Sequence, residues 1–116
     1  LAGLNQLISV PDIQNTLQAV GLQSDDNRPF KKYSLGMKQR LGIAAAIMEK
    51  PELLILDEPT NALDEHGVSM IAQLILEERE RGALVVIACH DADFVQRVSD
   101  VIIQMRDGKV TSVISK

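Results

Sequence analysis

The spacing of hydrophobic side chains near the start of the chain predicts a helix. Ile13, Leu17 and Val20 follow one another at intervals of four and three residues, which places them on one helical face. Ser9 can accept a hydrogen bond from the first turn, and Gly21 suits the left-handed residue that ends many helices. We therefore expect the N-terminal helix to lie between Ser9 and Gly21.

Further along the chain, helical spacing and short apolar runs alternate. The patterns predict a second helix over residues 34–49, a third over about 65–81 and a short fourth over about 91–98. Two runs without polar positions lie between these helices, at 53–56 and at 84–88. Runs this short and this uniform are typical of strands that are buried on both faces.

The last part of the chain predicts a β-hairpin. Hydrophobic segments at 101–105 and 110–114 flank the pair Asp107-Gly108, which favours a tight turn. Buried strands that alternate with helices indicate a largely parallel sheet with right-handed connections. The predicted fold class is therefore α/β, with helices first and a hairpin at the end.

Composition narrows the class of protein. The chain has 116 residues, of which 46% are hydrophobic, and this is enough for one domain with a core. Its formal net charge is −4, so the molecule as a whole has no general attraction to nucleic acid. The single cysteine, Cys89, excludes an internal disulfide and fits a reducing cytosol. No apolar run approaches the roughly 20 residues that span a bilayer.

Two adjacent acids carry the strongest chemical signal. Asp57 and Glu58 come directly after the first apolar run, at the expected C-terminal end of a strand. Ligands of parallel α/β sheets bind at this edge. One carboxylate there can hold Mg²⁺, and a second can orient or deprotonate an attacking water. A bare Asp-Glu pair is more often two solvated acids, but the complete apolar run before it argues for the chemical role.

Ser34 and Gly36 mark a second candidate site, at the start of the second predicted helix. Free N–H groups and the helix dipole favour an anion at this position. The Ser34 hydroxyl can reach a phosphate, and Gly36 allows the backbone to approach it closely. The alternative is an ordinary N-cap serine, and taken alone the segment favours that alternative.

Two further side chains become informative in this context. His90 follows the second apolar run directly, so its imidazole is expected at the same sheet edge, where it can bind a terminal phosphate. A lone histidine is more often structural, and this role depends on the other motifs. Asp64 follows the acids closely, and it either caps the third helix or contributes to a contact with a partner.

Together, these segments resemble the ATP-binding cassette (ABC) ATPases. Residues 34–39 look like the signature of that family, which usually reads Leu-Ser-Gly-Gly-Gln. Leu35 stands where a Gly is usual and Met37 where a Gln is usual. This variant is similar to that of antibiotic-export and bacitracin-resistance transporters. The resemblance implies that Ser34, Gly36 and Met37 contact the ATP held by a second subunit.

The same resemblance gives roles to the remaining motifs. It implies that Asp57 binds Mg²⁺, that Glu58 activates water and that His90 senses the γ-phosphate. Residues 61–64 match the D-loop of the family, in which Asp64 would bind near the nucleotide and link the two sites. The resemblance further implies a head-to-tail dimer around two ATP molecules and a separate membrane permease. It places the protein in the cytoplasm, at the inner face of the cell membrane.

The P-loop that such an ATPase needs is missing from these residues. The pair Gly108-Lys109 lacks both the preceding glycine and the following Ser or Thr of that motif. The resemblance therefore predicts a partial P-loop NTPase (ABC ATPase) fold. Residues 1–50 would belong to the helical subdomain, and 51–116 to the C-terminal half of the ATPase core. The start at Leu1 without a methionine suggests a fragment or a trimmed chain.

The predicted activity is ATP hydrolysis coupled to transport by the parent protein, whereas the 116 residues alone are not expected to hydrolyse ATP. Two alternatives stay open. The missing P-loop favours a non-enzymatic interaction module, and a soluble ABC protein that acts on ribosomes or DNA is the other. For the transport subunit we expect no nucleic-acid partner. Without the missing half, the edges and apolar sides of these strands would be exposed. We therefore expect the isolated chain to be unstable as a monomer, or to pair with another copy or with the missing half.

Overall fold

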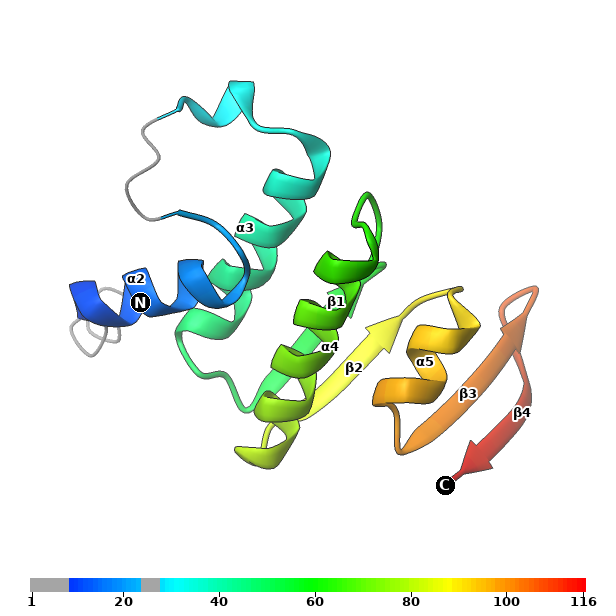
Figure 1. Cartoon of the computed structure of the whole chain (residues 1–116). Coiled ribbons are helices and arrows are strands. Elements are labelled where there is room, and N and C mark those ends of the chain that lie inside the picture. Colours follow the sequence, from blue (N-terminus) through cyan, green and yellow to red (C-terminus); the bar gives the residue numbers. More distant parts are fainter. Residues whose placement is uncertain (1–8, 24–27) are drawn as a thin grey trace.

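A computed structural model describes residues 9–23 and 28–116 of the chain; residues 1–8 and 24–27 of the predicted 1–50 segment lie outside the described residues. Figure 1 shows α2 and α3 at one end, α4 with β1 and β2 in the middle, and β3 and β4 at the other end. The elements in chain order are α2 (Val10–Ala19), η1 (Phe30–Lys32), α3 (Leu35–Met48), β1 (Leu53–Asp57), α4 (Glu65–Glu80), β2 (Leu84–Ala88), α5 (Ala92–Val98), β3 (Val101–Arg106) and β4 (Lys109–Ser115).

Capping side chains explain where the α-helices begin. Ser9 and Asp12 exchange two hydrogen bonds of 3.2 Å between side chain and backbone at the start of α2. Ser34, Asp64 and Asp91 each accept a hydrogen bond from a backbone N–H in the first turn of α3, α4 and α5. The predicted helices are therefore confirmed, with bounds close to those expected. The short η1, for which we made no prediction, comes before α3.

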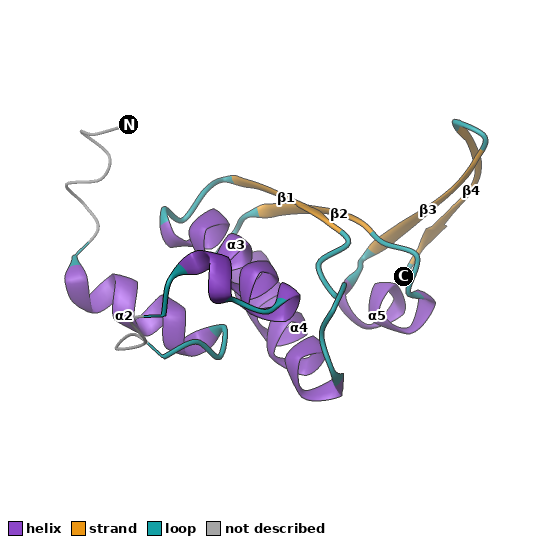
Figure 2. Ribbon diagram, turned by 90° about the horizontal axis from the view of Figure 1, so that it is seen from above, coloured by secondary structure: helices purple, strands orange, loops and turns teal. Residues whose placement is uncertain are grey.

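In the described part of the chain, the strands form two sheets of two strands each. β1 and β2 pair in parallel, with Leu53 opposite Leu84 and Asp57 opposite Ala88. β3 and β4 pair antiparallel, as the turn signal predicted, with a change of register after Gln104. In Figure 2, α3 and α4 lie on one side of the β1–β2 sheet. The α/β class, the parallel pairing and the C-terminal hairpin are confirmed.

The apolar runs are typical of strands buried on both faces, but in this chain the sheet is covered on one face only, and its other apolar side is exposed as expected for the chain without the missing half. Leu54 is 2% exposed because its side of the sheet is covered by the helices, whereas Ile55 is 66% exposed on the opposite side. Side chains alternate between the two faces of a strand, so a sheet with one helical layer buries every second residue. The exposed apolar residues of this uncovered face are Leu53, Ile55, Leu84 and Val86.

The core lies between the helices and the covered face of the β1–β2 sheet, and it is mainly aliphatic. Val20 at the end of α2 and Ile71 in α4 have no solvent exposure. Phe94 of α5 is the aromatic member of the core among the described residues. Burial of such side chains is the main favourable term of folding. The core therefore fixes α3 and α4 against the strands that lead to the candidate site.

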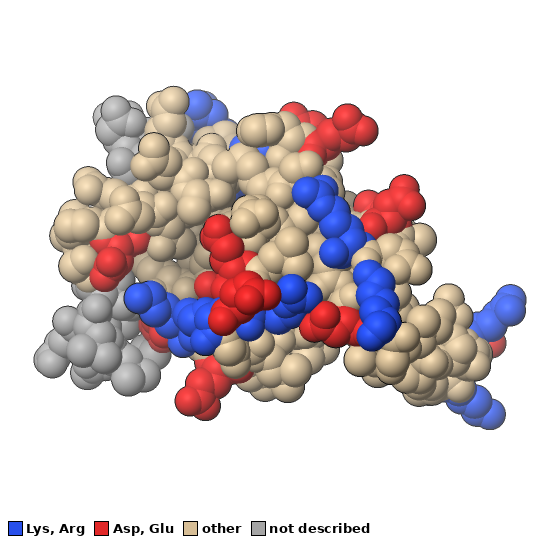
Figure 3. Space-filling model, turned by 60° about the horizontal axis from the view of Figure 1, so that its bottom comes forward, with Lys and Arg blue, Asp and Glu red and all other residues tan. Residues whose placement is uncertain are grey.

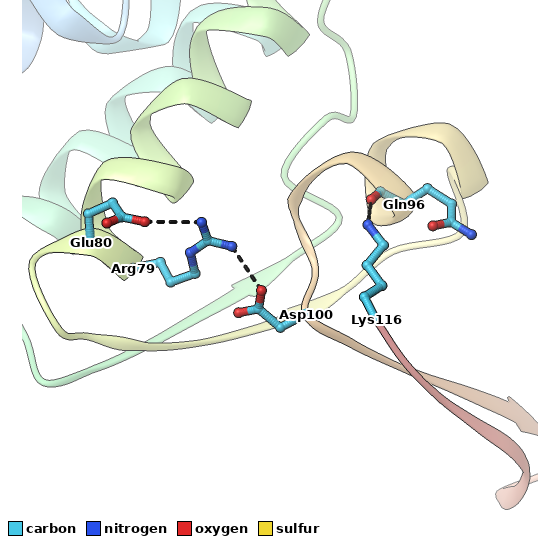
Figure 4. Close-up of polar contacts among 5 residues, drawn as sticks. All are labelled: Arg79, Glu80, Gln96, Asp100 and Lys116. Carbon is cyan, nitrogen blue, oxygen red and sulfur yellow. Dashed lines mark hydrogen bonds and ion pairs between the residues drawn. The ribbon is translucent and has the colours of Figure 1, made fainter.

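Polar contacts attach the C-terminal hairpin to the rest of the chain (Figure 4). Arg79 of α4 reaches Asp100, just before β3, with 2.9 Å between Nη1 and Oδ1, and Glu80 with 3.1 Å between Nη2 and Oε1. The hydrogen bond with Glu80 and the charge of Asp100 raise the pKa of Arg79. The Lys116 ammonium donates to the carbonyl of Gln96 in α5. Exposed pairs of this kind orient the hairpin and contribute little stability.

The charged side chains are mixed in sign. On the face drawn in Figure 3, basic and acidic residues are interspersed, and neither kind forms a separate patch. Within the described part of the chain, none of the helices has both the length and the apolar character required to cross a membrane.

Candidate functional site

The parallel pairing of β1 and β2 brings the predicted acids and the predicted histidine to one edge of the sheet. Asp57 is the last residue of β1 and is exposed, and Glu58 follows it in the chain. Ala88, opposite Asp57, is the last residue of β2, and His90 comes two residues later. Because both strands run in the same direction, their ends lie side by side at the edge where ligands of α/β sheets bind.

Glu58 and His90 form a direct polar contact. The Oε1 atom of Glu58 lies 2.8 Å from Nδ1 of His90. The hydrogen bond with Glu58 and the charge of this carboxylate raise the pKa of His90 above its ordinary value, and Asp91 adds to the effect. The imidazole side chain is 90% exposed and the Glu58 side chain 36% exposed, so both are accessible to a ligand at this edge.

The backbone of Glu58 adopts an unusual conformation that its neighbours hold in place. Its φ angle is +48°, in the left-handed region that residues other than glycine rarely adopt. Its N–H donates to the carbonyl of Ala88 over 2.7 Å. Its carbonyl accepts from the side-chain amide of Gln39 over 2.8 Å and from the N–H of Asn61 over 3.1 Å. Strain of this kind is often found at functional sites.

The start of α3 contacts the loop that follows the acids. The Ser34 hydroxyl accepts a hydrogen bond from the Met37 N–H over 3.1 Å, which is the N-cap geometry of the alternative interpretation. A Cβ atom on Gly36 would lie 2.9 Å from the carbonyl oxygen of Ala62, so the absence of a side chain permits this contact. Leu35, between them, is 75% exposed. The glycine thus has a packing role, and the phosphate approach that the sequence predicted stays a prediction.

Asp64 caps α4 and also faces the partly buried Arg40. Its Oδ1 accepts from the Gly67 N–H over 2.8 Å and lies 3.8 Å from Nη2 of Arg40. The Arg40 guanidinium lies against Gly21 and Gly67, where an added Cβ would be 3.0 Å and 2.8 Å away. The Arg40 side chain is mostly buried, and its Nε has no hydrogen-bond partner among the residues that the structure describes. The capping role of Asp64 is therefore confirmed.

The structure brings some of the predicted residues together and connects the others indirectly. Asp57, Glu58 and His90 share one edge, whereas Ser34 lies at the start of α3, the helix that also carries Gln39. Sequence reasoning gave no role to Gln39, although it lies inside the signature-like segment. Its polar side chain on a mainly apolar helix could have drawn attention to it.

The edge of the sheet offers Asp57 as one ligand for a magnesium ion whose other ligands would be waters and substrate phosphates. Among the described residues, no cluster of three or more His, Cys, Asp or Glu side chains could hold a metal ion. The exposed carboxylate of Asp57 is a single hard oxygen donor. Mg²⁺ commonly keeps several waters and binds one or two carboxylates together with substrate phosphates. Asp57 is thus suited to be one ligand of a Mg²⁺ ion that accompanies a nucleotide.

The sequence of this chain is similar to those of ABC transporter ATP-binding proteins. The sequence profile of the ABC transporter family matches residues 6–61. An uncharacterized ABC transporter ATP-binding protein YybJ of Bacillus subtilis (strain 168) is 41% identical over 110 residues, which are 95% of this chain and 50% of that protein. The bacitracin transport ATP-binding protein BcrA of Enterococcus faecalis is 42% identical over 116 residues, which are 99% of this chain and 38% of that protein.

A solved structure agrees with the sequence relatives. A dimeric ATP-binding cassette in a post-hydrolysis state, bound to ADP and Pi, superposes with a TM-score of 0.79 and 30% identity. The match covers 87% of this chain and 44% of the solved one. The chain therefore spans about half the length of the relatives that it matches.

Proposed function

Because the chain belongs to the ABC transporter family of ATP-binding proteins, we propose that it provides the signature-bearing half of a cassette that binds and hydrolyses ATP. The observation that carries this proposal is the contact between Glu58 and His90 at the strand edge beside Asp57. A carboxylate next to an imidazole, both accessible, suits the activation of a water near a terminal phosphate. In this proposal, residues 1–50 belong to the helical subdomain and 51–116 to the ATPase core.

Each site residue takes one task in the proposed reaction. Asp57 holds Mg²⁺, which neutralises developing charge on the phosphates when it is bound. Glu58 orients and deprotonates the attacking water, and His90, whose raised pKa favours the cationic form, donates to the γ-phosphate. Asp64 connects the site to the neighbouring subunit.

The start of α3 would act on the nucleotide of a second cassette. Ser34, Gly36 and Met37 lie where the helix exposes N–H groups, and such a terminus favours an anion. The exposed position of Leu35 at the same end leaves this surface open to a partner. The dimeric state of the solved relative supports a head-to-tail pair of cassettes.

The coupled process would be transport through a separate permease. Relatives in Enterococcus and Streptococcus carry the names of bacitracin and lantibiotic transport ATP-binding proteins, which supports transport of an antibiotic-like compound. The cassette would then work in the cytoplasm, at the inner face of the membrane. The 116 residues alone, without a P-loop sequence, are not expected to hydrolyse ATP.

The proposal is tested by Glu58→Gln in a full-length cassette that contains this chain. We expect ATP binding to persist and turnover to fall by about 10²–10⁴-fold, because the amide cannot accept the proton of water. Glu49→Gln, at the exposed end of α3, is the matched control and should leave turnover unchanged. Unaltered hydrolysis by Glu58→Gln would remove the glutamate from its proposed role.

A further inference from the structure

The position of the Glu58 carboxylate depends on the strained peptide that carries it. With φ at +48°, the Glu58 backbone is in a conformation that persists only where surrounding contacts maintain it. Pro59, which follows, restricts the Glu58 backbone further. If this peptide relaxed, the side chain would leave the position in which Oε1 lies 2.8 Å from the His90 ring.

The contacts that maintain this conformation come from three parts of the chain. The end of β2 accepts from the Glu58 N–H, through the Ala88 carbonyl at 2.7 Å. The turn that follows provides the Asn61 N–H, at 3.1 Å from the Glu58 carbonyl oxygen. The third contact is made by a side chain, Gln39 of α3, whose Nε2 lies 2.8 Å from the same oxygen.

We propose that Gln39 is a positioning residue: its amide holds the Glu58 peptide so that the carboxylate stays at the sheet edge beside His90. The contact is partly buried and joins residues 19 positions apart. It links α3, the helix that begins at Ser34, to the proposed catalytic acid. A displacement of α3 by a partner would therefore change the position of the Glu58 backbone. The proposal rests on the proposed function, in which Glu58 activates water.

The side-chain length and the donor atom of Gln39 can be separated by substitution. Gln39→Met keeps a similar length and removes the N–H donor, and Gln39→Glu replaces the amide by a carboxylate that repels the carbonyl. In a full-length cassette, we expect both variants to lower kcat by about 10- to 100-fold with little change in KM for ATP, because misplacement of a catalytic group mainly affects the chemical step. Gln14→Met, on an exposed position of α2, is the matched control.

A second measurement does not depend on hydrolysis. In the nucleotide-free cassette, NMR titration of His90 should give a lower pKa for Gln39→Met than for the unmodified protein, because the Glu58 carboxylate is no longer held at the ring. In the background of Glu58→Gln, Gln39→Met should leave the pKa of His90 unchanged, since the two residues act through one contact. A merely structural role of Gln39 would lower the pKa of His90 equally in both backgrounds.

Turnover and the pKa of His90 together distinguish a failure of the Gln39 proposal from a failure of the proposed role of Glu58. A loss of turnover with unchanged KM, together with the background-dependent change at His90, supports Gln39 as a positioning residue. An unchanged pKa of His90 in folded Gln39→Met overturns it, whatever the turnover. If Glu58→Gln retains hydrolysis while Gln39→Met still moves the pKa of His90, the positioning contact stands and the proposed role of Glu58 fails.

Discussion

At the scale of single residues, the contact between Glu58 and His90 makes stability depend on pH. The pKa of His90 is raised above its ordinary 6.5, so the folded state binds a proton more tightly than the unfolded state. The stabilisation is fully present below the unfolded pKa and is lost as the pH rises through the folded one. Glu58→Gln should therefore reduce the free energy of unfolding more at pH 6 than at pH 8.5.

Urea unfolding of a full-length cassette at the two pH values measures this difference. Glu49→Gln is the control, because its carboxylate lies at the exposed end of α3. Any effect of Glu49→Gln should not follow the titration of His90. An equal destabilisation by Glu58→Gln at both pH values would contradict the contribution of the charged pair.

From the sequence we could predict that Asp57, Glu58 and His90 lie at one edge of the sheet. The backbone conformation of Glu58 could not be predicted in this way. Asp57, Glu58 and His90 follow apolar strands, and the parallel pairing of those strands places them together for a simple geometric reason. The positive φ of Glu58 and the hydrogen bond from Gln39 depend on contacts between distant segments. No local pattern encodes such contacts, so they became visible only in the fold.

At the scale of elements, the packing of α3 against the loop after β1 depends on one missing side chain. Gly36→Ala would place a Cβ 2.9 Å from the Ala62 carbonyl oxygen, a backbone atom that cannot easily move away. We expect this substitution to destabilise the protein by about 1–3 kcal/mol, the usual cost of overpacking. Urea unfolding of a full-length cassette measures the effect.

The same helix contains the matched control for this prediction. Gly42 lies inside α3, and nothing is found within 4 Å of the Cβ that Gly42→Ala would add. Alanine is the better helix former, so Gly42→Ala should stabilise the protein by about 0.5–1 kcal/mol. Equal effects of the two substitutions would show that Gly36 has no special packing contact with Ala62.

The elements themselves were largely predictable because their signals are local. Hydrophobic spacing identified each α-helix, and the capping residues Ser9, Ser34, Asp64 and Asp91 mark where the helices begin. The number of buried faces of each strand could not be predicted from its own sequence. A uniform apolar run is typical of two covered faces, but the number of layers around a sheet depends on the other segments present. In this chain, Ile55 and Val86 therefore face solvent.

At the scale of the whole molecule, the β1–β2 sheet has an apolar face without a cover. The register places Leu53 beside Leu84 and Ile55 beside Val86, so four exposed apolar side chains lie together. The chain spans 44% of the solved cassette that it matches, which is consistent with a further segment covering this face in a complete cassette. Contiguous exposed apolar surface of this kind promotes association in water.

The isolated 116-residue chain should therefore associate with itself through this face. We expect sedimentation velocity to show a mass that increases with concentration, and the double variant Ile55→Thr, Val86→Thr to shift the chain toward the monomer. Threonine is well tolerated in strands and carries a hydroxyl, so it lowers the apolar surface with little cost to the strand. Val10→Thr is the control, because Val10 is exposed on α2, away from the sheet. A sharp, reversible unfolding of a monomer at every concentration would show that the uncovered face does not drive association.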